Sequence, residues 1–156
     1  MIIRKAEEKD VERLYEMLRQ VQQIHALGRP DIFKAGTNKY DRNAIRELLN
    51  KKDYSVFVAD DGGVAIGYAF CEIQRTENQE NLNDIKAYYI DDLCVDENYR
   101  GKGIGKELYD YVLGVAKKEK CYHLTLNVWN LNPTAVKFYQ KLGMQTLKMT
   151  MEEIIK

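Results

Sequence analysis

The sequence has few of the residues that build metal centres, disulfide frameworks or membrane spans. Only two histidines and three cysteines occur in 156 residues, and Cys71, Cys94 and Cys121 are widely spaced with no CxxC pair. An odd and dispersed set of cysteines argues against both a disulfide framework and a zinc site. The longest apolar runs are far shorter than the roughly 20 residues that a membrane-spanning helix needs.

An excess of charge of either sign is also absent, because 24 lysine and arginine residues balance 24 aspartate and glutamate residues. Such a chain has no general electrostatic attraction to nucleic acid or to an acidic membrane, so we expect neither as a partner. Met1-Ile-Ile-Arg-Lys leads directly into an acidic segment, unlike a signal peptide, which favours a cytoplasmic protein. The length suits one domain over residues 1–156.

The pattern of apolar residues predicts alternating strands and helices. Asp10 is a candidate N-cap for a first helix that stops near Gly28, and the segment His25 to Tyr40 has no clear period. The sequence Asp60-Asp-Gly-Gly63 predicts a hairpin turn. The expected strands are 2–4, 54–59, 64–73, 90–95 and 123–128. The expected later helices are 41–51, one from 104 that ends in the lysine cluster 117–120, and 133–142, with a polar exposed loop over 75–86.

The most informative stretch is Tyr88 to Gly105, in which an apolar strand leads through a glycine-rich turn into a helix. Gly101, Gly103 and Gly105 permit a loop whose backbone N–H groups converge on one point, with the positive end of a helix behind it. The natural occupant of that point is an anion, most plausibly a phosphate, and Arg100 adds positive charge nearby.

Two common phosphate-binding motifs do not fit this stretch. A P-loop would need Ser or Thr after the glycines, and a dinucleotide fingerprint would need glycine where the chain has Lys106. What remains is Arg-x-x-Gly-x-Gly at Arg100, Gly103 and Gly105, directly after a strand. This pattern resembles the acyl-CoA pyrophosphate loop of the GNAT N-acetyltransferases.

A second stretch, Asn130 to Met144, strengthens the resemblance. Asn132 and Pro133 are typical of a helix start, and Gly143 is typical of its end. The sequence Asn-x-Asn-Pro-x-Ala, then Phe-Tyr and Leu-Gly-Met, resembles the second GNAT signature in the family's order and at a family-like separation. The resemblance covers essentially the whole chain. It implies a single-domain GNAT-like α/β fold: a central mixed sheet, antiparallel in its first half, with splayed parallel middle strands, flanked by helices.

The resemblance also implies how acetyl-CoA would bind. Family members hold it in a wedge where two parallel strands splay apart, here strands 90–95 and 124–128, and a tyrosine at the position of Tyr139 protonates the departing thiolate. A backbone N–H near Leu93 would stabilise the oxyanion that forms when an amine attacks the thioester. The residues implied in cofactor binding are Leu93, Cys94 and Val95 along the pantetheine arm, Arg100, Gly101, Lys102, Gly103, Ile104 and Gly105 at the pyrophosphate, and Asn132.

The acceptor amine needs a group that collects its proton, because an alkyl amine with a pKa of about 10.4 is almost fully protonated at neutral pH. Asp91 is the preferred base, because in a regular strand it shares a face with Leu93. A β-bulge would exchange its role with that of Asp92. Glu72 on the neighbouring strand is a third option. The alternative for each carboxylate is an ordinary salt bridge or a solvated strand end.

Several alternatives remain open from the sequence. The acceptor is a small or polyamine-like amine, or else an N-terminal or lysine amine of a protein; a non-catalytic acyl-CoA sensor is the alternative of another class. The unpatterned segments 25–40 and 75–87 are expected to select the acceptor. His25 and Trp129 are each explained by packing as well as by a site, Cys94 and Cys121 are expected to be core residues, and the family resemblance makes a homodimer reasonable.

Overall fold

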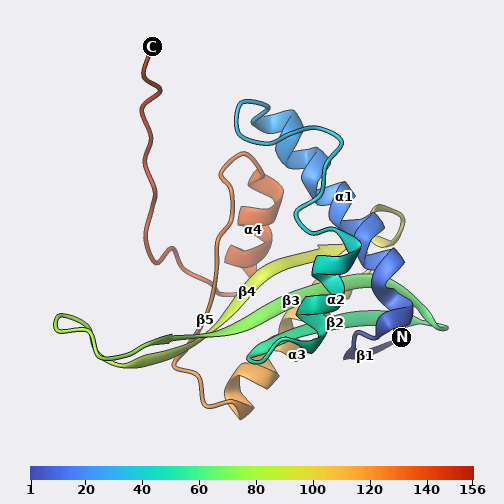
Figure 1. Cartoon of the computed structure of the whole chain (residues 1–156), viewed down its shortest axis with the longest axis horizontal. Coiled ribbons are helices and arrows are strands. Elements are labelled where there is room, and N and C mark those ends of the chain that lie inside the picture. Colours follow the sequence, from blue (N-terminus) through green and yellow to red (C-terminus); the bar gives the residue numbers. More distant parts are fainter.

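The computed structural model describes all residues, 1–156, as one five-stranded sheet with helices on both faces (Figure 1). The strand order is β1-β2-β3-β4-β5; every neighbouring pair is antiparallel except β4 and β5, which are parallel. The expected single α/β domain is confirmed. In chain order the elements are β1 Ile2–Lys5, η1 Glu8–Asp10, α1 Val11–Gly28, α2 Arg42–Asn50, β2 Tyr54–Asp61, β3 Val64–Thr76, β4 Ile85–Val95, η2 Glu97–Tyr99, α3 Ile104–Lys118, β5 His123–Leu126 and α4 Pro133–Lys141.

The sheet has a hydrophobic core on each face. Helices α1 and α2 cover one face, where Leu14 and Ile45 pack with Tyr68 and Phe70 of β3. Helix α3 covers the other face, where Val112 packs with residues of β2, β3 and β4, and α4 adds partly buried side chains. The two cores follow from alternation, because successive residues of a strand point to opposite faces.

A β-bulge interrupts the long β3–β4 hairpin at the centre of the sheet. Phe70 pairs with Asp92 and Cys71 pairs with Ile90, so Asp91 is an extra residue with no partner opposite it. Because residues directly opposite each other share a face, Asp92 lies on the α1/α2 face with Phe70. Asp91 lies on that face too, since its carboxylate contacts Tyr54.

The parallel pair separates soon after it forms. Pairing between β4 and β5 ends at Ile90 opposite Leu126, although β4 continues to Val95. The chain after β5 turns away and returns as α4. We call the opening between β4 beyond Ile90 and the chain beyond Leu126 the wedge. It is the separation of strands that the resemblance to the GNAT family implied.

Most predicted elements are present, and the differences lie at their ends. Strand β3 continues to Thr76 and strand β4 already begins at Ile85, so the exposed loop between them is shorter than expected. Strand β5 ends at Leu126 rather than at residue 128. Asp10 occupies the N-cap position of α1 without capping it, because its carboxylate binds Arg4 and the Glu7 N–H instead. No helix combines the length and apolar content needed to cross a bilayer.

Candidate active site

The backbone of β4 has a free edge where it borders the wedge. The Asp96 N–H donates to the Ile66 carbonyl of β3 at 2.9 Å. Because N–H directions alternate along a strand, the Leu93 and Val95 N–H groups point to the opposite side, where β5 has already separated. The edge of β4 at Leu93 therefore borders the wedge, and the Leu93 N–H also lies within reach of the Asp92 carboxylate.

The glycine-rich turn lies at the end of the same strand. Gly101 and Gly103 have φ values of 77° and 82°, in the left-handed region that favours glycine, and Gly103 is the N-cap of α3. The first N–H groups of a helix have no partner within it, so they remain available to an anion. We call residues 100–105 the phosphate loop. Arg100 stabilises the turn, because its Nε donates a hydrogen bond to the Val95 carbonyl at 3.1 Å.

A buried carboxylate anchors this turn to the first helix. Asp96 is 2% exposed and accepts hydrogen bonds from the Asn98 N–H at 2.9 Å and from Arg13 of α1 at 2.8 Å. Gln20 of α1 also donates to Asp96. The position of the phosphate loop therefore depends on α1, which is distant in sequence.

The two sequence motifs meet at Gly105. A Cβ added there would lie 3.2 Å from Cζ of Phe138, so α4 packs directly on the start of α3. Tyr139 follows Phe138 and packs partly buried against the core on the α3 face. Burial and then the nearby charge of Asp92 raise the pKa of the Tyr139 hydroxyl, which keeps it protonated at neutral pH.

Asp91 is held by three donors. Its carboxylate accepts from the Tyr40 hydroxyl at 2.5 Å, the Tyr54 hydroxyl at 2.8 Å and Lys39 Nζ at 3.0 Å. Burial alone would raise the pKa of Asp91, but these hydrogen bonds and the Lys39 charge outweigh it and hold the pKa below 3.8. A carboxylate that is this well satisfied is a poor proton acceptor.

Asp92 has the opposite environment. Burial is the main cause that raises the pKa of Asp92 to about 6. The positive charge of Lys39 lowers this pKa, and the negative charge of Asp91 raises it. The Tyr68 hydroxyl, close enough to interact with Asp92, is buried without a hydrogen-bond partner in the protein. The bulge puts the carboxylates of both Asp91 and Asp92 on the face of the sheet away from Leu93. In a regular strand Asp91 would share the face of Leu93, and the bulge prevents this.

The remaining predicted residues have simpler surroundings. Glu72 lies near Lys51 at 3.9 Å, at the edge of the site. Asn132 caps α4 by accepting from the Ala135 N–H at 3.2 Å. Cys94 is buried, and burial raises the pKa of its thiol to about 12, so a nucleophilic thiolate is scarce at neutral pH. Cys121 is partly buried against the same core as Tyr139.

Sequence reasoning missed the tyrosines that surround the carboxylates. Tyr40 comes from the unpatterned segment before α2, and Tyr54 and Tyr68 come from β2 and β3. The alternation of the strands could have placed Tyr54 and Tyr68 on one face, but no local signal places Tyr40 there. The same segment contributes Phe33, whose ring lies 4.9 Å from that of Trp129, so Trp129 belongs to an aromatic cluster.

Comparisons with known proteins bear on the family and the fold of this chain. The crystal structure of a single-residue mutant of the Bacillus halodurans protein BH1408 matches with a TM-score of 0.97 and 30% identity over 100% of both chains. A thialysine N-epsilon-acetyltransferase of Mus musculus is 28% identical, covering 93% of this chain and 84% of that protein. A spermine/spermidine N(1)-acetyltransferase of Bacillus subtilis is 29% identical, covering 53% of this chain and 54% of that protein, so the match spans about half of that relative. The sequence model of the acetyltransferase (GNAT) family matches residues 5–144, and the chain therefore belongs to this family.

Proposed function

We propose that the protein transfers the acetyl group of acetyl-CoA to a primary amine of a small molecule, by direct attack in a ternary complex. The observation that carries the proposal is the wedge, in which the edge of β4 at Leu93, unpaired with β5, lies between the phosphate loop and two carboxylates of opposite pKa shift. The family membership and the named relatives support the same reaction class.

The residues present fit acetyl-CoA at its phosphate end. Nothing lies within 4 Å of the Cβ positions at Gly101 and Gly103, so an anion can approach their backbone. Lys102 and Arg100 supply positive charge beside it, although Arg100 also braces the loop. From that anchor the pantetheine arm would run along Val95 and Cys94, and the thioester oxygen would accept from the Leu93 N–H, a preorganised donor for the oxyanion.

We assign the role of base to Asp92 rather than to Asp91. A carboxylate with a pKa of about 6 is roughly nine-tenths ionised at pH 7, and it is a better proton acceptor than one with a pKa below 3.8. Asp92 would collect the proton of the acceptor ammonium, directly or through a water, and Asp91 would hold Tyr40, Tyr54 and Lys39 in place around the amine.

Tyr139 would complete the proton transfers. Its raised pKa keeps the phenol protonated, so its hydroxyl can donate to the sulfur of the departing CoA thiolate. Because a thiolate is a tolerable leaving group unaided, this donor accelerates the reaction without being indispensable. Loss of Tyr139 should therefore slow turnover and leave binding intact.

The carboxylates and tyrosines also indicate the class of acceptor. Asp91 is already paired with Lys39 and bound by the hydroxyls of Tyr40 and Tyr54, whereas Asp92 has no ion-pair partner. An unpaired carboxylate at this site favours a cationic alkylamine over a neutral one. The names of the mouse and Bacillus subtilis relatives, which act on thialysine and on spermine or spermidine, support a small amine or polyamine-like acceptor.

The proposal is tested by calorimetric binding of acetyl-CoA, followed by thiol release with a panel of polyamines, amino acids and N-terminal peptides. We expect binding, and release with cationic small amines. Release with peptides alone would replace the small acceptor by a protein amine. Binding without release across the panel would favour a sensor, and absence of binding would refute the assignment of the phosphate loop.

A further inference from the structure

A site for an ammonium group at the start of the wedge is occupied by the chain's own Lys39. Its Nζ donates to the backbone carbonyl of Asp91 at 3.0 Å and to the carboxylate of the same residue at 3.0 Å. The ring of Tyr40 adds a cation–π contact, with Nζ 5.6 Å from the ring centroid. A carboxylate, a carbonyl and an aromatic face are groups that bind an alkylammonium ion. The surroundings that suit an acceptor amine therefore already hold an amine of the protein.

The residues on both sides of Lys39 fix the position of its backbone. On one side, Asn38 Nδ2 donates to the Tyr15 carbonyl of α1 at 2.9 Å. On the other side, the Tyr40 hydroxyl donates to the Asp91 carboxylate at 2.5 Å. The Lys39 side chain itself is 40% exposed, so its flexible four-carbon stem has room to move. The amine is thus kept close to β4 without being fixed at one point.

This site lies at the end of the wedge where acetyl transfer would take place. Asp91 is the first residue of β4 beyond its last pair with β5, which joins Ile90 and Leu126. Leu93, which the proposed function places at the thioester oxygen, follows two residues later, roughly 7 Å along a strand. Rotation about the carbon–carbon bonds of Lys39 is enough to carry its amine over such a separation.

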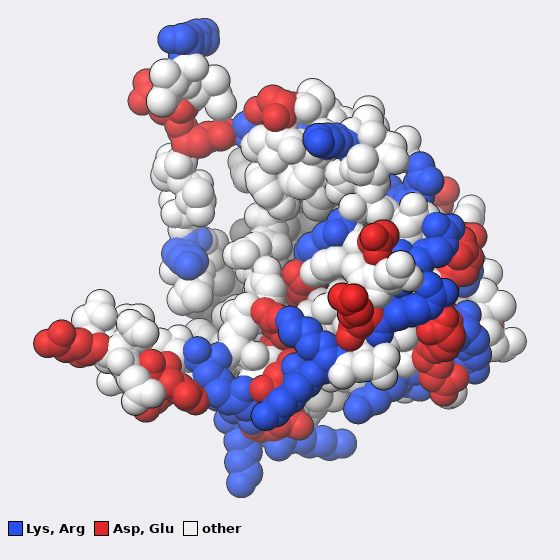
Figure 2. All heavy atoms as spheres, viewed as in Figure 1, with Lys and Arg blue, Asp and Glu red and all other residues white.

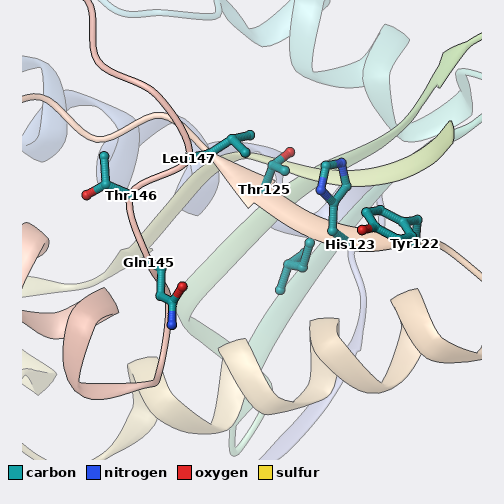
Figure 3. Close-up of a pocket in the computed structure, with 7 residues that line it drawn as sticks. Tyr122, His123, Thr125, Gln145, Thr146 and Leu147 are labelled. Atoms are coloured by element: carbon teal, nitrogen blue, oxygen red, sulfur yellow. The ribbon is translucent and has the colours of Figure 1, made fainter. Parts of the chain in front are cut away.

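No other lysine has these surroundings. Figure 2 shows lysine and arginine side chains scattered over the face in view, so exposure alone distinguishes none of them. Lys39 is the only lysine whose side chain forms a hydrogen bond or an ion pair with residues 90–95. The cleft of about 490 Å³ beside β5 (Figure 3) has neither a lysine nor a carboxylate in its lining, so it offers no amine and no carboxylate base.

We propose that the protein acetylates its own Lys39 when no other amine occupies the site, an inference that rests on the proposed function. The Lys39 ammonium gives a proton to Asp92, directly or through a water, and the nitrogen lone pair attacks the thioester carbonyl carbon of acetyl-CoA. The C–N bond forms, and the C–S bond breaks as CoA leaves as a thiolate that takes a proton from Tyr139. The nitrogen loses a second proton. Of the two protons released, one restores Tyr139 and the other passes to solvent, so the products are Nε-acetyl-Lys39, CoA and one proton.

The first test incubates the full chain with acetyl-CoA alone and follows the intact mass, with peptide mapping to locate the modification. We expect one acetyl group per chain, at Lys39. Its first-order rate constant should not change with protein concentration, because the amine and the site belong to one molecule. Lys39→Arg, which keeps the positive charge but has no nucleophilic amine, should not be modified. Lys34→Arg, which removes an exposed lysine of the same segment, is the matched control and should be modified like wild type.

The second test asks whether the site catalyses the modification. Tyr139→Phe should slow acetylation of Lys39 by the same factor of roughly 100 that we expect for kcat. Equal modification of Lys34 and Lys39, a rate constant that rises with protein concentration, or a rate at Lys39 that Tyr139→Phe leaves unchanged while kcat falls would each overturn the inference.

Calorimetric binding of acetyl-CoA and thiol release with the panel of small amines are measured on the same sample. If acetyl-CoA binds and a small amine is acetylated while Lys39 remains unmodified, the inference about Lys39 is wrong and the proposed function stands. Absence of acetyl-CoA binding overturns both.

Discussion

Asp91 and Asp92 are adjacent in β4, yet replacing each with asparagine should change stability in opposite directions. Burial raises the pKa of Asp92 from 3.8 to about 6. For Asp91, donors from Tyr40, Lys39 and Tyr54 outweigh burial and lower the pKa. The pair therefore offers a test of the site that depends on no substrate.

The magnitude for Asp92 follows from proton linkage. A shift of about two pKa units at about 1.36 kcal/mol per unit corresponds to about 3 kcal/mol. Between pH 4 and pH 6 the native protein holds a proton that the unfolded chain has lost, so the free energy of unfolding falls as the pH rises through this window. Asp92→Asn removes this dependence, and it should be more stable than wild type by up to about 3 kcal/mol above pH 7, with little difference at pH 4.

The sign for Asp91 is reversed. Its folded pKa is depressed, so its contribution to stability is present above the unfolded pKa and is lost as the pH falls through the folded pKa. Asp91→Asn should therefore destabilise the protein at pH 7, by about 1.5–3 kcal/mol, the range for hydrogen bonds to a charged group. This variant is the matched control for Asp92→Asn.

The assay is urea unfolding followed by circular dichroism, for wild type and both variants, at intervals from pH 4.5 to pH 8. The difference between Asp92→Asn and wild type should grow with pH and level off above about pH 7. If both variants destabilise equally at pH 7, or if the Asp92→Asn difference is the same at both ends of the range, the assignment of Asp92 as the high-pKa carboxylate is refuted.

Other substitutions test the remaining parts of the site. Tyr139→Phe should lower kcat by roughly 100-fold without changing the Kd for acetyl-CoA, measured by thiol release and calorimetry; an unchanged kcat removes its role as acid. Gly103→Val, which forces a β-branched residue to a φ of 82°, should weaken that Kd by at least roughly tenfold. Gly114→Ala, in open space on α3, is its control and should add about 1 kcal/mol of stability in urea unfolding without altering the Kd. Lys39→Gln should raise the pKa of Asp92 and move the acidic limb of the kcat/KM profile to higher pH; an unmoved limb contradicts the role of Asp92.

Many turns and helix ends could be predicted from the sequence, because a few adjacent residues determine them. The turn at Asp60-Asp-Gly-Gly63, the cap at Asn132 and the left-handed Gly143 all lie where predicted, because each is set by a few adjacent residues. The same holds for the strand, loop and helix around Gly103. Prediction failed first at strand ends, since the extension of β3 and β4 depends on pairing with each other rather than on their own composition.

The sequence by itself indicated the reaction class, because residues 100–105 and the α4 motif are short stretches that resemble the two signatures of the GNAT family. Only the tertiary structure gave the two adjacent carboxylates different surroundings. One extra residue in β4 turns Asp91 toward Tyr40 and Tyr54, and it leaves Asp92 half-buried near the Tyr68 hydroxyl. The pKa of a carboxyl depends on burial and on donors brought from distant strands and loops, and no spacing along the chain encodes those contacts.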